Sequence, residues 1–421
     1  MPLTDFQRPG FASLVNLGGR LLGPALGRFV NLDAADLVAT ARARTGLEHF
    51  GEPDLRPAME QLLAACTTEA RLNLFGRLAV RSDLLRVLRN RLWMERDRRH
   101  FPGIAAQSID RPIFVVGLPR SGTTFLHRLL SQDPGNRVPF TWEAMLPSPP
   151  PEAATHDSDP RIEFAERQVR WFLRLAPQFQ RIHPVGARLA EECVLLHSHS
   201  FVSYQFDTMY RIPSYSAWLE QQDFRDSYQV HRQVLQHLQW KCPGHRWVLK
   251  APNHLFQLPA LLATYPDACL VWTHRTPLDT LASLASLCTE LRRVFSDAVI
   301  PTEVGPELAV TWAEGVRRAM AALDSGLVSP DRVLHVPYPE LIRDPLAVVR
   351  RVYDRFDLEL SAQAEQRLTQ FPKANPKGRF GQHQYSLQEF GLDPAREAER
   401  FAPYCQRFLD GTCHPHRRAR T

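Results

Sequence analysis

The first hundred residues carry a helical pattern of hydrophobic and polar positions. Over residues 55–97, apolar side chains recur every three or four positions with arginines between them. This spacing is typical of amphipathic helices packed along one side. Pro102 and Gly103 then interrupt it. We therefore predict an N-terminal helical region over residues 1–108.

From Arg111 onward the pattern changes to short apolar runs, each followed by a loop and a helical stretch. These runs are IFVVG (113–117), WVLK (247–250), CLVWTH (269–274) and VLHVP (333–337). Continuous apolar runs alternating with helices are typical of parallel strands that are buried on both faces. The pattern predicts an α/β domain over residues 109–395, with a P-loop-NTPase-like parallel β-sheet flanked by helices.

A long segment separates the first two runs. Residues 141–245 include a proline-rich stretch, LPSPPPE (146–152), and are otherwise mostly helical in pattern. We expect a helical insertion that covers the ligand-binding edge of the sheet. Residues 396–421 predict a C-terminal helix followed by a basic tail.

Composition and charge narrow the picture only a little. The chain has 421 residues and a net charge of +6, which suits an anionic ligand without requiring one. Lysine occurs at only four of the 51 positions that carry lysine or arginine. We therefore expect a retained lysine to mark a position that requires a compact ammonium group. We expect no nucleic-acid partner and no transmembrane segment. Seven cysteines without a C-x-x-C motif fit neither a disulfide framework nor a zinc site, and favour a cytoplasmic location.

The strongest motif is GLPRSGTT, which follows the first apolar run. Gly117 and Gly122 allow the backbone to approach an anion closely, and residues 121–124 begin a helix whose N–H groups and positive end attract phosphate. A nucleotide-hydrolysing P-loop would carry lysine where Thr123 stands. We expect a phosphate-type anion to be held by Arg120 and by the residues listed here: Ser121, Gly122, Thr123 and Thr124.

Polar residues also follow the other apolar runs. Because ligands bind beyond the carboxyl ends of parallel strands, these side chains should meet at one edge. Lys250 ends an apolar strand, where it either binds an anion or forms a buried salt bridge. Arg275 lies in a turn and Ser283 two helical turns later, so both could hold one phosphate, although Arg275 could equally be a surface residue. Tyr338 could stack on a base or pack in the core.

Together these segments resemble the sulfotransferases that use 3′-phosphoadenosine 5′-phosphosulfate (PAPS). PRSGTT resembles the loop that holds the donor's 5′-phosphosulfate, in the arginine form of the tyrosylprotein and carbohydrate branches. Arg275 and Ser283 keep the spacing of the pair that binds the 3′-phosphate, and Lys250 matches the lysine of a K-x-P motif. A basic loop is matched more loosely by Lys377, Gly378 and Arg379. The resemblance covers residues 111–385 and implies a bacterial-type member.

The resemblance implies a metal-independent, in-line transfer of a sulfuryl group to an acceptor hydroxyl, with 3′,5′-ADP as product. Arg120 and Lys250 would neutralise charge on the bridging oxygen as the S–O bond breaks. The acceptor needs a base. Pro252 stands where the cytosolic branch has a histidine, so that assignment fails. Glu143 matches the base of the tyrosylprotein branch, and His254 is the alternative base. Glu143 could instead be a surface carboxylate with no catalytic role.

The sequence leaves several questions open. One alternative is a P-loop kinase or nucleotide hydrolase, and another is a non-catalytic adenine-nucleotide-binding protein. Residues 189–206 predict a helix that either lines an acceptor pocket or forms salt bridges, through Glu191, Glu192 and His199. The acceptor could be a small-molecule, carbohydrate or lipid hydroxyl. The oligomeric state is open, with a homodimer as one option.

Overall fold

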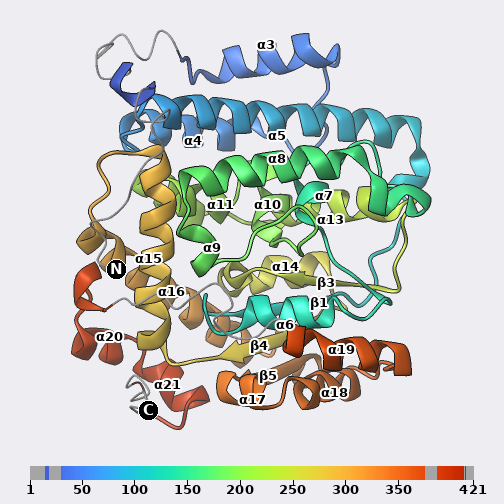
Figure 1. The fold of residues 1–421 in the computed structure, drawn as a ribbon, viewed down its shortest axis with the longest axis vertical. Helices are drawn as coiled ribbons and strands as arrows, with labels where there is room; N and C mark the ends of the chain where they lie inside the picture. Colours follow the sequence, from blue (N-terminus) through green and yellow to red (C-terminus); the bar gives the residue numbers. More distant parts are fainter. Residues whose placement is uncertain (1–14, 19–29, 375–385, 412, 414–421) are drawn as a thin grey trace. The chain divides into compact units, whose positions relative to one another are not determined.

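The computed structural model describes residues 15–18, 30–374, 386–411 and 413, apart from the side chain of Arg181. The chain forms two compact units, and each is assembled from separate stretches of the sequence (Figure 1). The helical unit comprises Met1–Ser108, Pro139–Pro243 and Cys288–Val299, and the sheet unit comprises Ile109–Val138, Gly244–Leu287 and Ile300–Thr421. The division into three consecutive regions that we predicted from the sequence (1–108, 109–395 and 396–421) stays a prediction.

The helical unit is built around α5 (Leu74–His100), its longest described helix. The Asn73 side chain caps it by accepting a hydrogen bond from the Gly76 N–H at 2.8 Å, and Leu84, Leu88 and Leu92 form a buried stripe at helical spacing. The other described helices are α3 (Ala34–Thr45), α4 (Arg56–Thr68), η3 (Pro102–Ile104), α7 (Thr141–Met145), η4 (Ala153–Ser158), α8 (Pro160–Leu175), α9 (Phe179–Ile182), α10 (Cys193–His197), η5 (Ser198–Ser200), α11 (Tyr204–Met209), α12 (Pro213–Glu220) and α13 (Arg225–Gln239).

The sheet unit contains a parallel sheet of five strands in the order β2-β3-β1-β4-β5. The strands are β1 (Ile113–Gly117), β2 (Asn136–Arg137), β3 (Arg246–Lys250), β4 (Cys269–His274) and β5 (Val333–Pro337). All five residues of β1 and all six of β4 are buried, as expected for central strands covered on both faces. The register pairs Gly117 with Thr273 and Val115 with Lys250, which brings the strand ends that precede the candidate loops to one edge.

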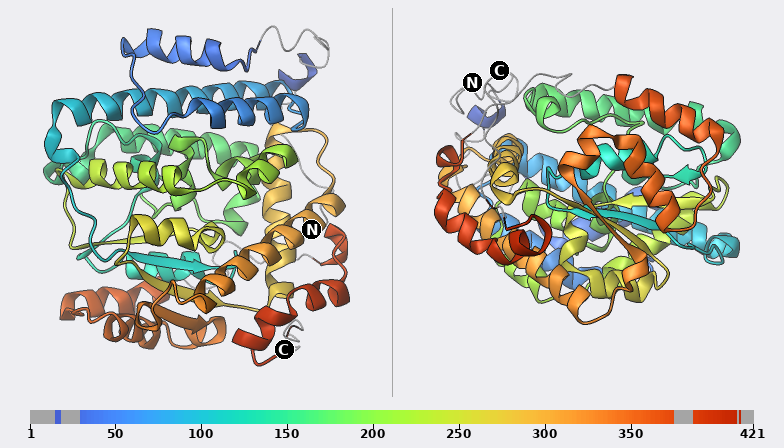
Figure 2. Two further views of the ribbon diagram at one scale, coloured as in Figure 1. Left: turned by 180° about the vertical axis from the view of Figure 1, so that it is seen from behind. Right: turned by 90° about the horizontal axis from the view of Figure 1, so that it is seen from below.

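Helices lie on both faces of this sheet (Figure 2). Helix α6 (Thr123–Leu130), which follows β1 in the chain, contacts β1, β3 and α19. The helices η6 and α14 contact α16. The described helices of this unit are α6, η6 (Pro252–Phe256), α14 (Leu258–Thr264), α15 (Pro277–Phe295), which continues into the helical unit, α16 (Pro301–Asp324), η7 (Pro330–Arg332), α17 (Tyr338–Arg343), α18 (Pro345–Arg355), α19 (Ala362–Ala374), η8 (Gln388–Phe390), α20 (Pro394–Arg400) and α21 (Ala402–Phe408).

The structure confirms the predicted α/β class and the four predicted strands, and it corrects two details. The two-residue strand β2 was not predicted, because so short a segment carries no periodicity. The helix predicted over residues 189–206 is wrong: this segment is divided into α10, η5 and α11, and Phe201 adopts a left-handed φ of 61° between the last two. Glu191 and Glu192 therefore precede α10 instead of sharing a helical face with His199.

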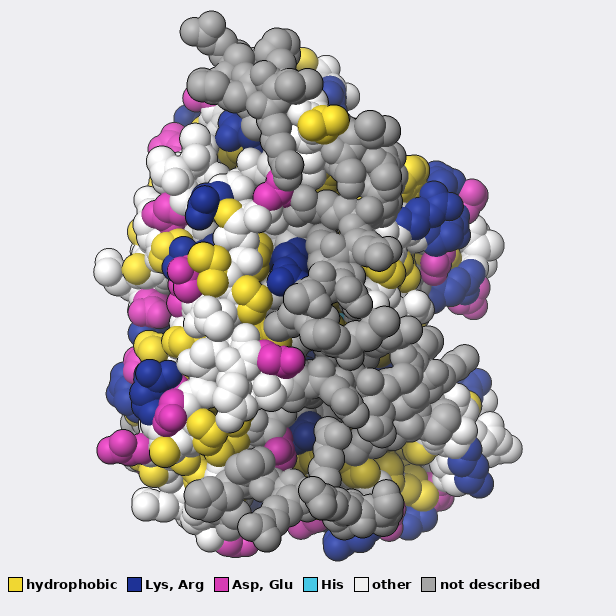
Figure 3. Space-filling model, turned by 60° about the vertical axis from the view of Figure 1, so that its left-hand side comes forward, with side chains coloured by type: hydrophobic (Ala, Val, Ile, Leu, Met, Phe, Trp, Pro, Cys, Tyr) yellow, Lys and Arg dark blue, Asp and Glu magenta, His cyan; other side chains and the backbone are white. Residues whose placement is uncertain are grey.

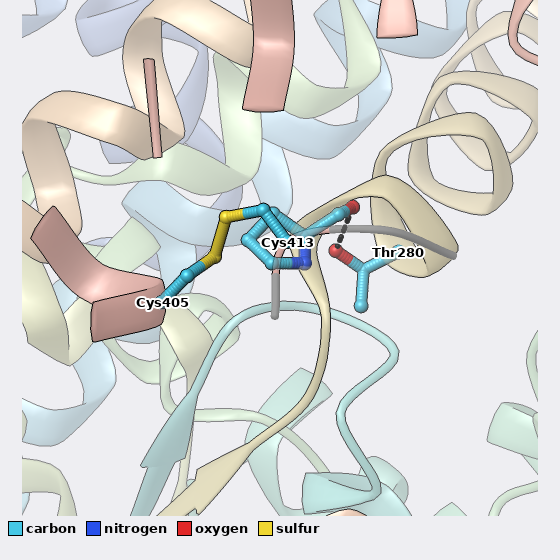
Figure 4. Close-up of a disulfide and its surroundings, with 4 residues drawn as sticks. Thr280, Cys405 and Cys413 are labelled. Carbon is cyan, nitrogen blue, oxygen red and sulfur yellow. Dashed lines mark hydrogen bonds between the residues drawn. A yellow bond between two sulfur atoms is a disulfide. The ribbon is translucent and has the colours of Figure 1, made fainter. Parts of the chain in front are cut away.

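One disulfide joins Cys405 in α21 to Cys413, and Figure 4 shows it near Thr280 of α15. The cysteine pattern did not predict this pair, because a count of thiols does not say which two the fold brings together. The other five cysteines are buried and take no part in a disulfide.

Two further features of the structure are the length of its helices relative to a membrane and the charges on one face of its surface. None of the helices in the described ranges is long and apolar enough to cross a membrane. On the face shown in Figure 3, basic side chains lie interspersed with acidic ones, as expected for a chain whose net charge is only +6.

Candidate functional site

The loop after β1 is shaped by a close approach to the neighbouring strand. Gly117 has a φ of +145°, and a Cβ at this position would lie 2.5 Å from both the carbonyl oxygen and the Oγ1 atom of Thr273. No side chain fits at that distance, so the first glycine of the motif is required by packing. Gly122 has a φ of +98°, and a Cβ there would meet Leu341 and Tyr338 at 2.9 and 3.1 Å. Both glycines therefore hold the loop close to its neighbours.

The Ser121 side chain links this loop to β4. Its hydroxyl lies 2.6 Å from the carbonyl oxygen of Leu118 and 2.6 Å from the Oγ1 atom of Thr273, and its side chain is fully buried. Helix α6 then begins at Thr123, as the sequence predicted for residues 121–124. The N–H groups of its first turn have no partners within the helix, which makes this end suited to an anion.

Lys250 approaches the same helix from the end of β3. Its Nζ atom donates a hydrogen bond to the Thr124 hydroxyl at 3.2 Å, and only 1% of the residue is exposed. A buried ammonium requires hydrogen-bond partners or a nearby anion. The contact places a positive charge beside the first turn of α6, where the sequence analysis expected it.

Arg120 joins the loop to α15. It adopts a left-handed φ of 69°, which is uncommon for a residue with a side chain. Its Nε atom donates to the Ser283 hydroxyl at 3.0 Å, and its carbonyl oxygen accepts a hydrogen bond from Nη1 of Arg275 at 2.9 Å. Arg275 and Ser283 therefore both contact Arg120, whereas the sequence suggested only that they share a ligand.

Arg275 also contacts an aromatic ring. Its guanidinium carbon lies 4.3 Å from the centre of the Tyr338 ring, and its Nε atom lies 3.9 Å from a carboxylate oxygen of Asp279. Stacking on an aromatic face holds a guanidinium in a fixed plane. Tyr338 is half-buried at the start of α17, so it is not part of the sheet core.

The structure brings together most of the predicted residues of the sheet unit. Direct contacts connect Tyr338, Arg275, Arg120 and Ser283 into one chain, and Lys250 contacts Thr124 in the same loop-helix junction. The other predicted loop residues are Ser121, Gly122 and Thr123, and they lie between these contacts in sequence. The predicted residues Lys377, Gly378 and Arg379 lie outside the described residues.

His274, the last residue of β4, directly precedes Arg275 but adds no positive charge there. His274 is buried, with its two ring nitrogens 3.0 Å from the Tyr404 hydroxyl and 2.8 Å from Nδ1 of His335. Burial holds the pKa of His274 well below its usual value, and nearby His335 lowers it further. The imidazole is therefore neutral at physiological pH.

The two candidate bases have different surroundings. His254 lies in η6 of the sheet unit, is almost fully buried, and packs edge-on against Phe114 with ring centres 4.9 Å apart. Glu143 lies in α7 of the helical unit and is fully buried, so it is not a surface carboxylate. One of its carboxylate oxygens accepts the Phe140 N–H at 2.9 Å, and the other lies 3.0 Å from Nε2 of His156.

The acidic residues before α10 form structural contacts. A carboxylate oxygen of Glu191 accepts a hydrogen bond from the Thr141 hydroxyl at 2.9 Å, and Glu192 lies 3.6 Å from the His183 ring. His199 is fully buried in η5, with its ring 3.1 Å from the Asn90 side chain. In the described part of the chain, no three His, Cys, Asp or Glu side chains are grouped as metal ligands would be.

Sequence reasoning missed Thr273 and Asp279. Thr273 shapes the loop through Gly117 and Ser121, and Asp279 is the acidic neighbour of Arg275. A signal for Thr273 was present, because a polar residue near the end of a fully buried strand requires a partner. Asp279 gave no such signal, because a carboxylate in the first turn of a helix is common and does not indicate that it faces a neighbouring arginine.

Comparison with known proteins agrees with this geometry. The model of the sulfotransferase family matches residues 112–362. The chain is 28% identical over 265 residues to omega-hydroxy-beta-dihydromenaquinone-9 sulfotransferase Stf3 of Mycobacterium bovis (strain ATCC BAA-935 / AF2122/97). That alignment covers 59% of this chain and 63% of Stf3, so the chain spans less than two thirds of the relative's length.

Two solved structures are similar over most of their length. Sulfotransferase STF1 from Mycobacterium tuberculosis H37Rv is 35% identical, with a TM-score of 0.78 over 88% of this chain and 98% of STF1. Sulfotransferase STF9 from Mycobacterium avium is 30% identical, with a TM-score of 0.82 over 89% of this chain and 96% of STF9. The chain therefore belongs to the sulfotransferase family.

Proposed function

We propose that this protein transfers a sulfuryl group from PAPS to an acceptor hydroxyl. The observation that carries the proposal is the contact chain in the sheet unit: Arg120 of the β1 loop touches Ser283 and Arg275, which follow β4. PAPS has a negatively charged group at each end of its ribose. Two linked cationic positions on neighbouring strand ends suit such a ligand better than a single phosphate-binding loop would.

The loop would hold the 5′-phosphosulfate. Gly117 and Gly122 hold the loop close to its neighbours, and the first N–H groups of α6 would donate to the anion. Arg275 and Ser283 would bind the 3′-phosphate, because a guanidinium fork and a hydroxyl match phosphate oxygens. The ring of Tyr338, beside Arg275, offers an aromatic face to the adenine.

Cationic side chains would stabilise the charge that develops during transfer. Arg120 and Lys250 flank the start of α6, and both would place N–H donors near the bridging oxygen as the S–O bond breaks. Positioned charges of this kind act most strongly in a site from which water is excluded. We propose that no divalent metal ion takes part in the reaction.

The acceptor hydroxyl must lose its proton, and we propose Glu143 as the base, with His254 as the alternative. Glu143→Gln keeps the size of the side chain and an oxygen that can accept the Phe140 N–H. We expect this variant to retain its affinity for 3′,5′-ADP and to lose about 10²- to 10⁴-fold in turnover. Unchanged turnover, with His254→Ala inactive, would assign the role to His254.

We propose a lipid or other apolar alcohol as the acceptor. The support is the name of Stf3, which describes a sulfotransferase for a hydroxylated menaquinone. We propose a cytoplasmic location, because five of the seven cysteines form no disulfide. A small-molecule or carbohydrate hydroxyl is the competing acceptor class, and a panel of alcohols with and without an alkyl chain would separate them.

A thermal-shift comparison of four nucleotides tests the donor. We expect PAPS and 3′,5′-ADP to stabilise the protein by roughly 3 kcal/mol when the ligand is present at a hundredfold excess over its Kd. AMP and ATP with Mg²⁺ lack the 3′-phosphate and should stabilise it much less. Preference for ATP with Mg²⁺ would instead support a P-loop kinase. Tight binding of 3′,5′-ADP without sulfuryl transfer to any alcohol would support a non-catalytic nucleotide-binding protein.

A further inference from the structure

Helix α8 of the helical unit exposes aromatic side chains on one face. Phe164 and Trp171 are 36% and 47% exposed, and they lie two helical turns apart on the same side of the helix. The sequence has eight tryptophans, all within the described residues, and Trp171 is the most exposed of them. Large aromatic residues are normally buried, so their exposure in register on one helix requires an explanation.

Each exposed ring is covered by an arginine three residues later. The guanidinium carbon of Arg167 lies 5.9 Å from the centre of the Phe164 ring, and that of Arg174 lies 5.1 Å from Trp171. Arg170 is exposed on the adjacent side of the helix. The same aromatic-arginine pair thus occurs twice along α8, and we call this surface the α8 strip: Phe164, Arg167, Arg170, Trp171 and Arg174.

The opposite side of α8 fixes the strip in place. Ile162 and Ala165 are buried in a cluster with Trp142, and the Asp159 side chain caps the helix by accepting the Arg161 N–H at 2.9 Å. The exposed residues are therefore presented by an anchored helix, on the side away from its buried residues. They are available to a partner without any local unfolding.

The charge of the strip favours an anionic partner. It carries three arginines, and the acidic residue among its exposed neighbours on α8 is Glu163, which pairs with Arg167 at 2.7 Å. The three arginines and Glu163 together carry a net charge of about +2. Aromatic rings flanked by arginines are typical of surfaces that lie at a membrane interface, where the rings enter the headgroup region and the guanidiniums bind lipid phosphates.

We propose that the α8 strip docks this protein on a bilayer that contains anionic lipids. A second copy is a poorer occupant, because a twofold contact would place the arginines of one strip against those of the other. The proposal concerns an interaction surface and does not rest on the proposed reaction, since docking requires neither donor nor turnover. If the acceptor is a membrane lipid, docking would bring the enzyme to it.

Vesicle flotation of the full chain tests the proposal. The probes are phosphatidylcholine vesicles with and without about one-third phosphatidylglycerol. We expect binding to the anionic vesicles alone, and we expect it to weaken in high salt, because exposed charges are screened. Arg167→Gln, Arg170→Gln and Arg174→Gln, combined in one variant, should weaken partitioning about 150-fold, since three positive charges are removed and each contributes about 1 kcal/mol near an anionic surface.

A second variant removes the apolar part of the strip. Trp171→Ser should weaken partitioning about tenfold through loss of roughly half the burial of one aromatic side chain, and Trp171→Phe should restore most of it. These exposed positions should change the melting temperature little. The matched control replaces Arg225, Arg343 and Arg350 with glutamine, which removes the same charge from exposed positions outside the strip.

The controls give each result a meaning. Equal losses in the control and in the strip variant would attribute vesicle binding to overall charge and would overturn the proposal. Absence of binding by the unmodified protein would overturn it as well. A concentration-dependent dimer that is lost in Trp171→Ser, without vesicle binding, would assign the strip to a second copy instead. Sulfuryl transfer to a water-soluble alcohol is measured in parallel. If the unmodified protein shows no transfer, that result would count against the proposed reaction and not against membrane docking.

Discussion

Replacing Arg275 with alanine separates binding of the 3′-phosphate from support of the loop. In the structure, this guanidinium donates to the Arg120 carbonyl at 2.9 Å and stacks on Tyr338 at 4.3 Å. The side chain is 26% exposed, so water can replace part of what is lost. Loss of this hydrogen bond, from a charged donor to a neutral carbonyl at a partly exposed site, costs about 1.5 kcal/mol of folding stability. Loss of a charge-assisted bond to phosphate costs about 2 kcal/mol, which is about thirtyfold in Kd.

The assay is titration calorimetry with two ligands, 3′,5′-ADP and AMP, on the unmodified protein and on Arg275→Ala. Loosening of the Arg120 loop would weaken both ligands equally, whereas loss of a phosphate contact weakens only 3′,5′-ADP. We therefore expect an additional loss of about thirtyfold for 3′,5′-ADP. Arg343→Ala, an exposed arginine of α17, serves as the control. Equal losses for the two ligands would refute the assignment and leave Arg275 as a support of the loop.

Three further predictions concern the loop, the transfer step and the response to pH. Gly117→Ala should lower the free energy of unfolding in urea by about 3 kcal/mol, because its Cβ would lie 2.5 Å from a backbone oxygen at a φ of +145°. Lys250→Met should lower single-turnover rates about 10²- to 10³-fold and change 3′,5′-ADP affinity much less, because its charge acts mainly in the transition state. Burial and, to a smaller extent, the charge of Arg86 lower the pKa of His199 to about 3, so stability should be lost as the pH falls from about 6.5 towards 3. Urea unfolding of His199→Gln, which does not titrate, should show a shallower loss over this range.

Each of these predictions has a result that would contradict it. Gly326→Ala shares a positive φ of 73° but meets no atom within 4 Å, so it should cost only about 1 kcal/mol; an equal cost at Gly117 would mean that the close approach relaxes. Parallel losses of rate and affinity in Lys250→Met would make the lysine a ground-state ligand. An unchanged pH profile in His199→Gln would mean that other groups govern the acid response.

The local features of the fold could be predicted from the sequence. The apolar runs of β1, β4 and β5 match their strands from end to end, and the motif GLPRSGTT was correctly followed by a helix. Such features depend on neighbouring residues: apolar continuity marks a buried strand, and glycine permits the backbone turn that follows it. The prediction over residues 189–206 failed for the same reason, since its periodicity gave no sign that Phe201 adopts a left-handed conformation.

What the sequence alone determined is four of the five strands, the residues of the loop after the first strand, and the order in which cationic residues follow the strands. Only the tertiary structure decided that Ser283 contacts Arg120 across 163 positions, that Thr273 closes on Gly117, and that Glu143 is buried against His156. It also decided that each compact unit combines three separate stretches of chain. These contacts join residues far apart in sequence, and their geometry is set by strand register and side-chain packing, which no local pattern of residues encodes.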